Sequence, residues 1–244
     1  MSIKIFHPGN SALCFETEKS KLIIDGIYCS DDSIKNVGMS PMPAEYEAMI
    51  KTETGAFSNP DMIAFTHTHT DHYDEKEVSE YLAANQEVCY FSMNDSRNNV
   101  PVETAEAVEV IRMKDFELFV LPVRHLTVGD IVEDVPSCSF LLKYGQENYF
   151  IGGDSHLDLE VYDKYCGVLG CKIKYAFLNA VQIASGFGQQ FIRSLNPETI
   201  VIYHLPEKED DLFNYYSFVR NFERKCSEDM PQYIVAKHME WINV

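Results

Sequence analysis

The sequence predicts an α+β fold in which two β-sheets pack face to face and helices cover the outside. Three observations support this fold class. Short apolar or alternating runs of strand length dominate the chain, and helical patterns follow each strand-rich half. Hydrophobic residues make up 45% of the 244 residues, which is enough for a large core. No linker or short-period repeat interrupts the pattern, so residues 1–244 are predicted to form a single domain.

Strand-length runs and turn signals define the first part of this fold. Runs at 3–6, 12–16 and 21–25 are separated by Pro-Gly-Asn-Ser and Glu-Lys-Ser, and such short connections predict consecutive antiparallel strands. Asp74 and Glu77 are spaced like a capping pair at the start of a helix. The elements expected next are a helix at 44–52, a strand at 62–65, a helix at 75–84 and strands at 87–91, 107–113 and 116–123.

The second half of the chain begins with a predicted hairpin around Gly145-Gln146, between strands at 137–144 and 148–151. Aromatic residues in the last amphipathic helix are interpreted as packing residues, with a contact between identical chains as the alternative. A homo-oligomer is therefore left open. The elements expected after the hairpin are helices at 157–169, 187–194 and 211–226 and strands at 173–178, 199–203, 233–235 and 240–244.

The stretch DMIAFTHTHTDHYD, residues 61–74, concentrates groups that bind metals. Its H-x-H-x-D-H motif cannot present all four polar groups on one helical face, because neighbours on a helix are three or four residues apart. On a tight loop the four side chains can converge. Imidazole nitrogen and carboxylate oxygen suit zinc, and carboxylates also suit iron or manganese. The motif therefore predicts a metal-binding loop made of His67, His69, Asp71 and His72.

Three further groups each follow a predicted strand, at His125, Asp154 and His204. Any one of them alone would be interpreted as a surface residue. Together with the loop they supply five histidines and two aspartates, which is enough for two three-ligand sites that share one bridging carboxylate. The repetition at strand ends favours a binuclear metal site.

At these positions the sequence resembles the metallo-β-lactamase superfamily, through THTHTDH at 66–72, His125, Asp154 in GGDS, and His204. The likeness extends over nearly the whole chain and implies a four-layer αββα sandwich of two mixed sheets. The opening HPGNSALCFET and KLIIDG are most similar to the small bacterial hydrolase branch that includes L-ascorbate-6-phosphate lactonase. Two features depart from that branch: Asn10 stands where many relatives have histidine, and YAFLNAVQIASGFGQ lacks the usual Leu-Pro turn.

The resemblance implies a binuclear hydrolase that uses a metal-bound hydroxide on a small-molecule ester, lactone or phosphoester. It implies two divalent ions, with zinc favoured and manganese or iron as alternatives. Asp71 would also orient the hydroxide or pass on its proton, and His156 is a candidate acid or base. The alternative function is a metal-binding sensor or scaffold without productive catalysis. The implied ligands are His67, His69 and His125 for one ion, Asp71, His72 and His204 for the second, and Asp154 as the bridge.

Three other side chains have competing interpretations. Asp25 ends a predicted strand, and it is expected to fix the tautomer of a ligand histidine rather than to cap a turn. His7 and His238 have no partner motif and are expected to be core or surface residues.

The composition restricts the partners of the chain. A formal net charge of −18 opposes nucleic acid, which proteins bind mainly through lysine and arginine. No run approaches the roughly 18 to 20 apolar residues that a membrane-spanning helix needs, and no secretory signal is recognised. The seven scattered cysteines are interpreted as reduced thiols. A cytoplasmic protein with a small-molecule substrate, and without a membrane or nucleic-acid partner, is expected.

Overall fold

The computed structural model describes residues 3–105, 108–127, 135–169, 171–226 and 230–243. The chain divides into two units, each with its own sheet. The first unit contains Met1–Val100, His204–Phe213 and Ala236–Val244, and the second contains Pro101–Tyr203 and Asn214–Val235. The chain returns to each unit after leaving it, so no single cut separates the two. The prediction of one domain over residues 1–244 stays a prediction.

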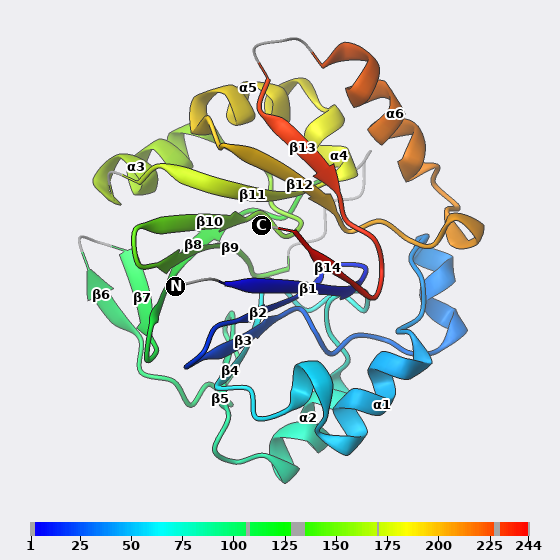
Figure 1. Cartoon of the computed structure of the whole chain (residues 1–244), viewed down its shortest axis with the longest axis vertical. Coiled ribbons are helices and arrows are strands. Elements are labelled where there is room, and N and C mark those ends of the chain that lie inside the picture. The colour runs from blue at the N-terminus through cyan, green and yellow to red at the C-terminus, as the bar shows by residue number, and fades with distance from the viewer. Residues whose placement is uncertain (1–2, 106–107, 128–134, 170, 227–229, 244) are drawn as a thin grey trace. The chain divides into compact units, whose positions relative to one another are not determined.

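The first unit is built on a mixed six-stranded sheet. Strands β14, β1, β2 and β3 pair antiparallel, whereas β3, β4 and β5 pair parallel. The predicted run of consecutive antiparallel strands is therefore confirmed, and β14 joins the last part of the chain to the first strand (Figure 1). In spatial order the strands are β14 (Glu240–Ile242), β1 (Lys4–Gly9), β2 (Ala12–Glu16), β3 (Lys21–Ile24), β4 (Met62–Phe65) and β5 (Cys89–Ser92).

Two α-helices of the first unit have the predicted bounds, α1 at Ala44–Thr52 and α2 at Glu75–Ala84. The ring of Phe57 links them, because it lies 5.6 Å from the Tyr46 ring and 5.3 Å from the Tyr81 ring. Helix α2 begins after Asp74, whose side chain accepts a hydrogen bond from the Glu77 N–H. The chain between β4 and α2 is thus anchored by a buried strand and a capped helix. Short 3-10 helices cover Asp32–Val37 (η1), Gly55–Phe57 (η2) and Lys208–Asp210 (η3).

The second unit is built on a mixed eight-stranded sheet. Its strands pair antiparallel from β6 to β10 and parallel from β10 to β13. Gly145 makes the predicted hairpin turn with a φ of 61°, which glycine adopts without steric cost. In spatial order the strands are β13 (Gln232–Val235), β12 (Thr199–Tyr203), β11 (Ile173–Asn179), β10 (Glu147–Ile151), β9 (Ser137–Tyr144), β8 (Phe116–Val123), β7 (Val108–Arg112) and β6 (Glu103–Ala105).

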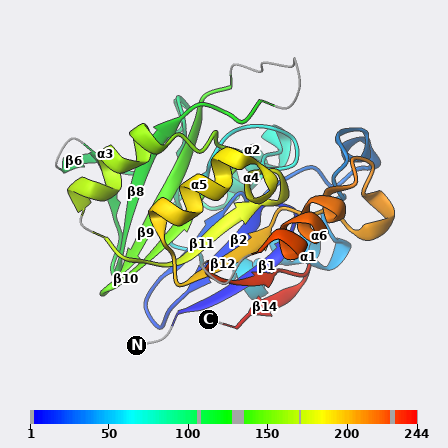
Figure 2. The ribbon, with the colours of Figure 1, turned by 90° about the horizontal axis from the view of Figure 1, so that it is seen from above.

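Helices α3 (Leu159–Leu169), α4 (Ala180–Ala184) and α5 (Gly186–Leu195) lie along one face of this sheet (Figure 2). Aromatic contacts connect the helices to the strands. The ring centroid of Phe150 in β10 lies 5.1 Å from that of Tyr162 in α3 and 5.4 Å from that of Phe191 in α5. The short helix α4 was not predicted, because five residues are too few to show a helical period.

Helix α6 spans Tyr215–Lys225, so the predicted start at residue 211 is wrong. The residues before it form η3, and Asn214 then adopts a left-handed conformation with φ 60°, which interrupts a continuous helix. Among the described residues, no helix has both the length and the apolar character needed to cross a membrane.

Candidate metal centre

The H-x-H-x-D-H motif forms a tight loop between β4 and α2. The N–H groups of His72 and Tyr73 both donate to the carbonyl of His69, at 2.9 and 2.8 Å. Backbone bonds to the preceding segment hold the loop at both sides, from Cys29 N–H to the Thr70 carbonyl and from Asp74 N–H to the Ile27 carbonyl. The loop is thus restrained by backbone contacts that do not depend on the identity of its side chains.

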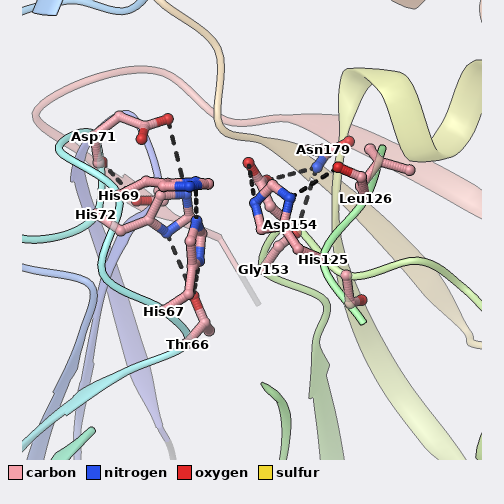
Figure 3. A network of polar contacts seen from close by, with 12 residues as sticks. Thr66, His67, His69, Asp71, His72, His125, Leu126, Gly153, Asp154 and Asn179 are labelled. Atoms are coloured by element: carbon pink, nitrogen blue, oxygen red, sulfur yellow. Dashed lines mark hydrogen bonds and ion pairs between the residues drawn. The ribbon is translucent and has the colours of Figure 1, made fainter. Parts of the chain in front are cut away.

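His67 and His69 direct ring nitrogens toward the same point (Figure 3). The distance between His67 Nε2 and His69 Nδ1 is 3.0 Å. Two ligands of a tetrahedral zinc ion with ordinary bond lengths are about 3.3 Å apart, so the pair fits one ion with little adjustment. The other ring nitrogen of His67, Nδ1, lies 3.1 Å from the Thr66 hydroxyl.

Asp71, His72 and His204 form a second group within the first unit. His204 Nε2 lies 3.0 Å from Asp71 Oδ2, and His72 Nε2 lies 3.8 Å from the same oxygen. All three side chains are buried. His204 is placed here by a left-handed backbone conformation, φ 55°, directly after β12. Nitrogen and oxygen donors gathered this closely match the preferences of zinc, iron and manganese.

The buried carboxylate of Asp25 orients this group. Its Oδ2 lies 2.9 Å from His72 Nδ1 and accepts a 2.8 Å bond from the Thr66 hydroxyl, while Oδ1 accepts from the Thr66 N–H at 2.7 Å. A carboxylate can only accept when ionised, so His72 donates from Nδ1 and keeps a lone pair on Nε2, which faces Asp71. The contact with a ligand histidine that the sequence interpretation expected for Asp25 is therefore present.

In the second unit, His125 and Asp154 lie close together after β8 and β10 (Figure 3). His125 Nδ1 donates to the Leu126 carbonyl at 2.8 Å, which leaves Nε2 as its candidate ligand atom. Nε2 lies 3.9 Å from Asp154 Oδ2. A backbone bond of 2.6 Å from Leu126 N–H to the Asp154 carbonyl joins the two segments. The pair therefore offers one nitrogen and one oxygen to the same region.

His156 lies two residues beyond Asp154 and is partly exposed. Its backbone N–H donates to the Arg124 carbonyl at 2.8 Å, and its ring lies 6.0 Å from that of Phe187, which is 68% exposed. A partly exposed imidazole close to a candidate metal ligand is suited to proton transfer, so the acid–base interpretation of His156 stays a prediction.

His7 is a core residue, as expected. Its Nδ1 donates to the Ala12 carbonyl at 2.8 Å, and burial, followed by the nearby His238, lowers its pKa to about 3. His238 contacts the segment after His204, since its Nε2 donates to the Leu205 carbonyl at 2.7 Å. Both histidines thus support the fold of the first unit.

Asn10 has a structural role. Its φ of 40° lies in the left-handed region, where asparagine is tolerated better than most residues. Its buried side chain donates to the Ser40 carbonyl at 2.8 Å and accepts from the Ser40 N–H at 3.3 Å. Both polar ends of the amide are therefore engaged by the backbone of residue 40.

A cavity of about 780 Å³ opens beside the metal loop at Thr68 and Thr70, within the first unit. Its charged walls are Asp74, Glu75, Asp95 and Arg97. The Arg97 guanidinium contacts Asp95 at 2.6 Å and Glu75 at 2.9 Å.

The cavity keeps an excess of negative charge at neutral pH. Burial works against the ionised form of Asp95, but hydrogen bonds from Arg97 and Tyr90 outweigh it and lower the pKa of this carboxyl to about 2. Hydrogen bonds from Tyr73 and Arg97 also lower the pKa of Glu75. The lining of the cavity therefore holds three carboxylates and one guanidinium.

Sequence reasoning missed two residues that contact the candidate ligands. Thr66 precedes the motif and bridges Asp25 and His67. Asn179 is the last residue of β11 and donates to Asp154. A signal for Asn179 was present, because Asn179 and Gln182 have the spacing of a capping box.

A comparison with models of known protein families gives no match, and neither does a comparison with curated protein sequences. Solved structures do match. Igni18, a metallo hydrolase from the archaeon Ignicoccus hospitalis, aligns with a TM-score of 0.65 and 15% identity over 98% of this chain and 97% of that chain. YhfI, a metallo-β-lactamase fold protein from Bacillus subtilis, aligns with a TM-score of 0.61 and 10% identity over 98% of both chains.

CmlA, a diiron β-hydroxylase from Streptomyces venezuelae, aligns with a TM-score of 0.62 and 14% identity over this whole chain but only 54% of that chain. The matches to Igni18 and YhfI over nearly the whole chain show that the chain has the metallo-β-lactamase fold. The predicted α+β class, two mixed sheets with flanking helices, is confirmed. Proteins of this fold include metal-dependent hydrolases, among them Igni18. The closer resemblance to the lactonase branch stays a prediction.

Proposed function

We propose that the protein is a binuclear metal-dependent hydrolase that cleaves an ester, lactone or phosphoester bond in a small molecule. The observation that carries this proposal is the pairing of ligand atoms in the first unit. Two nitrogens of His67 and His69 lie 3.0 Å apart, and Asp71 lies 3.0 Å from His204. Separate pairs of this kind are suited to two cations rather than one.

The proposed ligand set extends to the second unit. His125 and Asp154 supply the remaining donors, and their ligand atoms lie 3.9 Å apart. In the proposed centre, His125 joins His67 and His69 on one ion, Asp71, His72 and His204 hold the second, and Asp154 bridges the two. The donor types favour zinc, with manganese or iron as alternatives.

Two divalent ions at this place would polarise the scissile bond and lower the pKa of bound water toward 7. Protein side chains would orient the attacking water and transfer the protons. Asp71, buried against two histidines, would orient the attacking water and accept its proton. His156, which is partly exposed, would return a proton to the leaving oxygen.

The formal charge of −18 disfavours nucleic acid as a substrate, so the proposed substrate is a small molecule. We place the protein in the cytoplasm and leave a homo-oligomer open.

Metal analysis and a substrate panel test the proposal. Purified protein should hold about two transition-metal ions per chain and hydrolyse a lactone, an ester or a bis-aryl phosphodiester. Asp154→Ala should lower both metal content and turnover. Hydrolysis by Asp154→Ala at the parent rate would contradict the assignment. Two bound ions without turnover on any substrate would instead favour a metal-binding sensor or scaffold.

A further inference from the structure

Asn179 is the last residue of β11, and Gln182 lies in α4, the helix that follows directly. Asn179 is 4% exposed and Gln182 is 1% exposed. Buried amides are costly unless they are hydrogen-bonded, so the contacts of these two side chains indicate what they do.

The Asn179 amide has only one orientation that satisfies its neighbours. Its Oδ1 accepts a 2.8 Å bond from the Gln182 N–H, which can only donate. Its Nδ2 must therefore be the end that faces Asp154, and it donates to Asp154 Oδ1 at 2.8 Å (Figure 3). A hydrogen bond to a carboxylate is stronger than one between neutral groups.

Gln182 is oriented in the same way and holds the backbone on both sides of Asp154. Its Oε1 accepts from the Asn179 N–H at 2.9 Å, so Nε2 donates to the carbonyls of Ser155 at 2.9 Å and Gly153 at 3.2 Å. The close fit extends to Gly152, where an added Cβ would lie 3.0 Å from Gln182 Oε1. The two amides thus restrain the Asp154 side chain and its backbone together.

We infer that Asn179, oriented by Gln182, is a positioning residue that occupies Oδ1 of Asp154 and presents Oδ2 to the metal centre. Oδ2 is the oxygen that lies 3.9 Å from His125 Nε2. This inference rests on the proposed function, in which Asp154 is a metal ligand. Without the Asn179 donor, the carboxylate would rotate about its terminal bond, and the oxygen that reaches the metal would no longer be selected.

Asn179→Ser tests the inference because it separates the two tasks of the side chain. Serine is as good a helix N-cap as asparagine, but it is too short to reach Asp154. The matched control is Asn148→Ser, which removes another buried asparagine bond of the second unit, to the Lys172 carbonyl at 3.0 Å. Zinc affinity is measured by competition with a coloured chelator, and the thermal midpoint is measured on metal-free protein.

Asn179→Ser should weaken zinc binding about 10- to 100-fold, the range seen when a residue that orients a ligand is removed. Asn148→Ser should bind zinc like the parent, and the two metal-free variants should melt at similar temperatures. Asn179→Asp keeps the cap and the shape but places a carboxylate against Asp154 Oδ1. It should weaken zinc at least as much as Asn179→Ser, and a parent-like affinity would contradict the inference.

Parent-like zinc affinity in Asn179→Ser would overturn the positioning role while leaving the proposed function intact, provided that Asp154→Ala still loses metal. An equal loss of affinity in Asn148→Ser would also overturn it, because the effect would then be general destabilisation. A parent protein that binds no zinc, manganese or iron would overturn the proposed metal centre and this inference together.

Discussion

The metal loop of the first unit and the Asp154 segment of the second unit hold candidate ligands in different ways. The loop places His67, His69, Asp71 and His72 within six residues, and its own backbone bonds form the turn. Asp154 has no such local motif. Its side chain is held by Asn179, and its flanking carbonyls by Gln182, both more than twenty residues further along the chain. Candidate ligands that are close in sequence can thus be positioned by a single turn. Asp154, which has no candidate ligand beside it in the motif, is positioned by side chains from distant parts of the chain.

The largest expected effect comes from removing the nitrogen pair of the loop. His67→Ala combined with His69→Ala should reduce bound metal from about two ions to about one per chain and bring hydrolysis below detection. The loop should still form, because its turn bonds are between backbone atoms. Elemental analysis and circular dichroism of the purified variant check both parts. Retention of two ions would place the first metal elsewhere.

A smaller effect is expected from Asp25→Asn. This substitution is the reverse of Asn179→Asp in the second unit, because it replaces a carboxylate that contacts a candidate ligand with an amide. The amide would present its N–H₂ or its weaker carbonyl to His72 Nδ1, so the tautomer with a free Nε2 would no longer be favoured. Zinc affinity should fall about 10- to 100-fold. Chelator competition measures this fall, with the thermal midpoint of metal-free protein as the control. An unchanged affinity would mean that the loop orients its own histidines.

The third prediction concerns acid stability and depends on His7. Its folded pKa of about 3 lies below the ordinary value of 6.5, so between these pH values the unfolded chain binds a proton that the folded chain excludes. The free energy of unfolding should therefore fall as the pH falls through 6.5, by about 2 kcal/mol at pH 5.

Urea titrations at pH 7 and pH 5 measure this difference. His7→Asn retains a donor for the Ala12 carbonyl and cannot titrate, so its stability should change less between the two pH values. If the parent and His7→Asn lost equal stability at pH 5, another group would be responsible. The result would also show whether the first unit, which contains the metal loop, limits acid stability.

The smallest effect is expected at Thr66. Thr66→Val keeps the N–H that donates to Asp25 Oδ1 and removes only the hydroxyl that donates to Oδ2. Loss of this one bond should cost about 1 kcal/mol of unfolding free energy and less than a tenfold change in zinc affinity. Urea unfolding and chelator competition measure the two quantities. A larger loss of affinity than in Asp25→Asn would make the hydroxyl, rather than the carboxylate, the main support of the loop.

Strands and helices were predicted well where the apolar pattern extends over the whole element and its ends carry local signals. Helix α2 has the predicted bounds because Asp74 caps it, and β8 and β12 match because most of their residues are apolar. Helix α4 was missed because five residues are too few to show a helical period, and the three-residue strand β6 was missed as well. The start of α6 was misplaced because the left-handed Asn214 is not marked by any residue pattern.

The sequence by itself determined the donor atoms of the candidate site and their order along the chain. Residue chemistry and strand-to-helix spacing are local properties, so the H-x-H-x-D-H loop and the groups after three strands are visible without coordinates. Only the tertiary structure decided which atom of each ligand is available. Asp25 selects Nε2 of His72, and Asn179 selects Oδ2 of Asp154, through hydrogen bonds between residues far apart in the chain. Such bonds depend on distances of a few ångströms, which folding sets and sequence spacing does not.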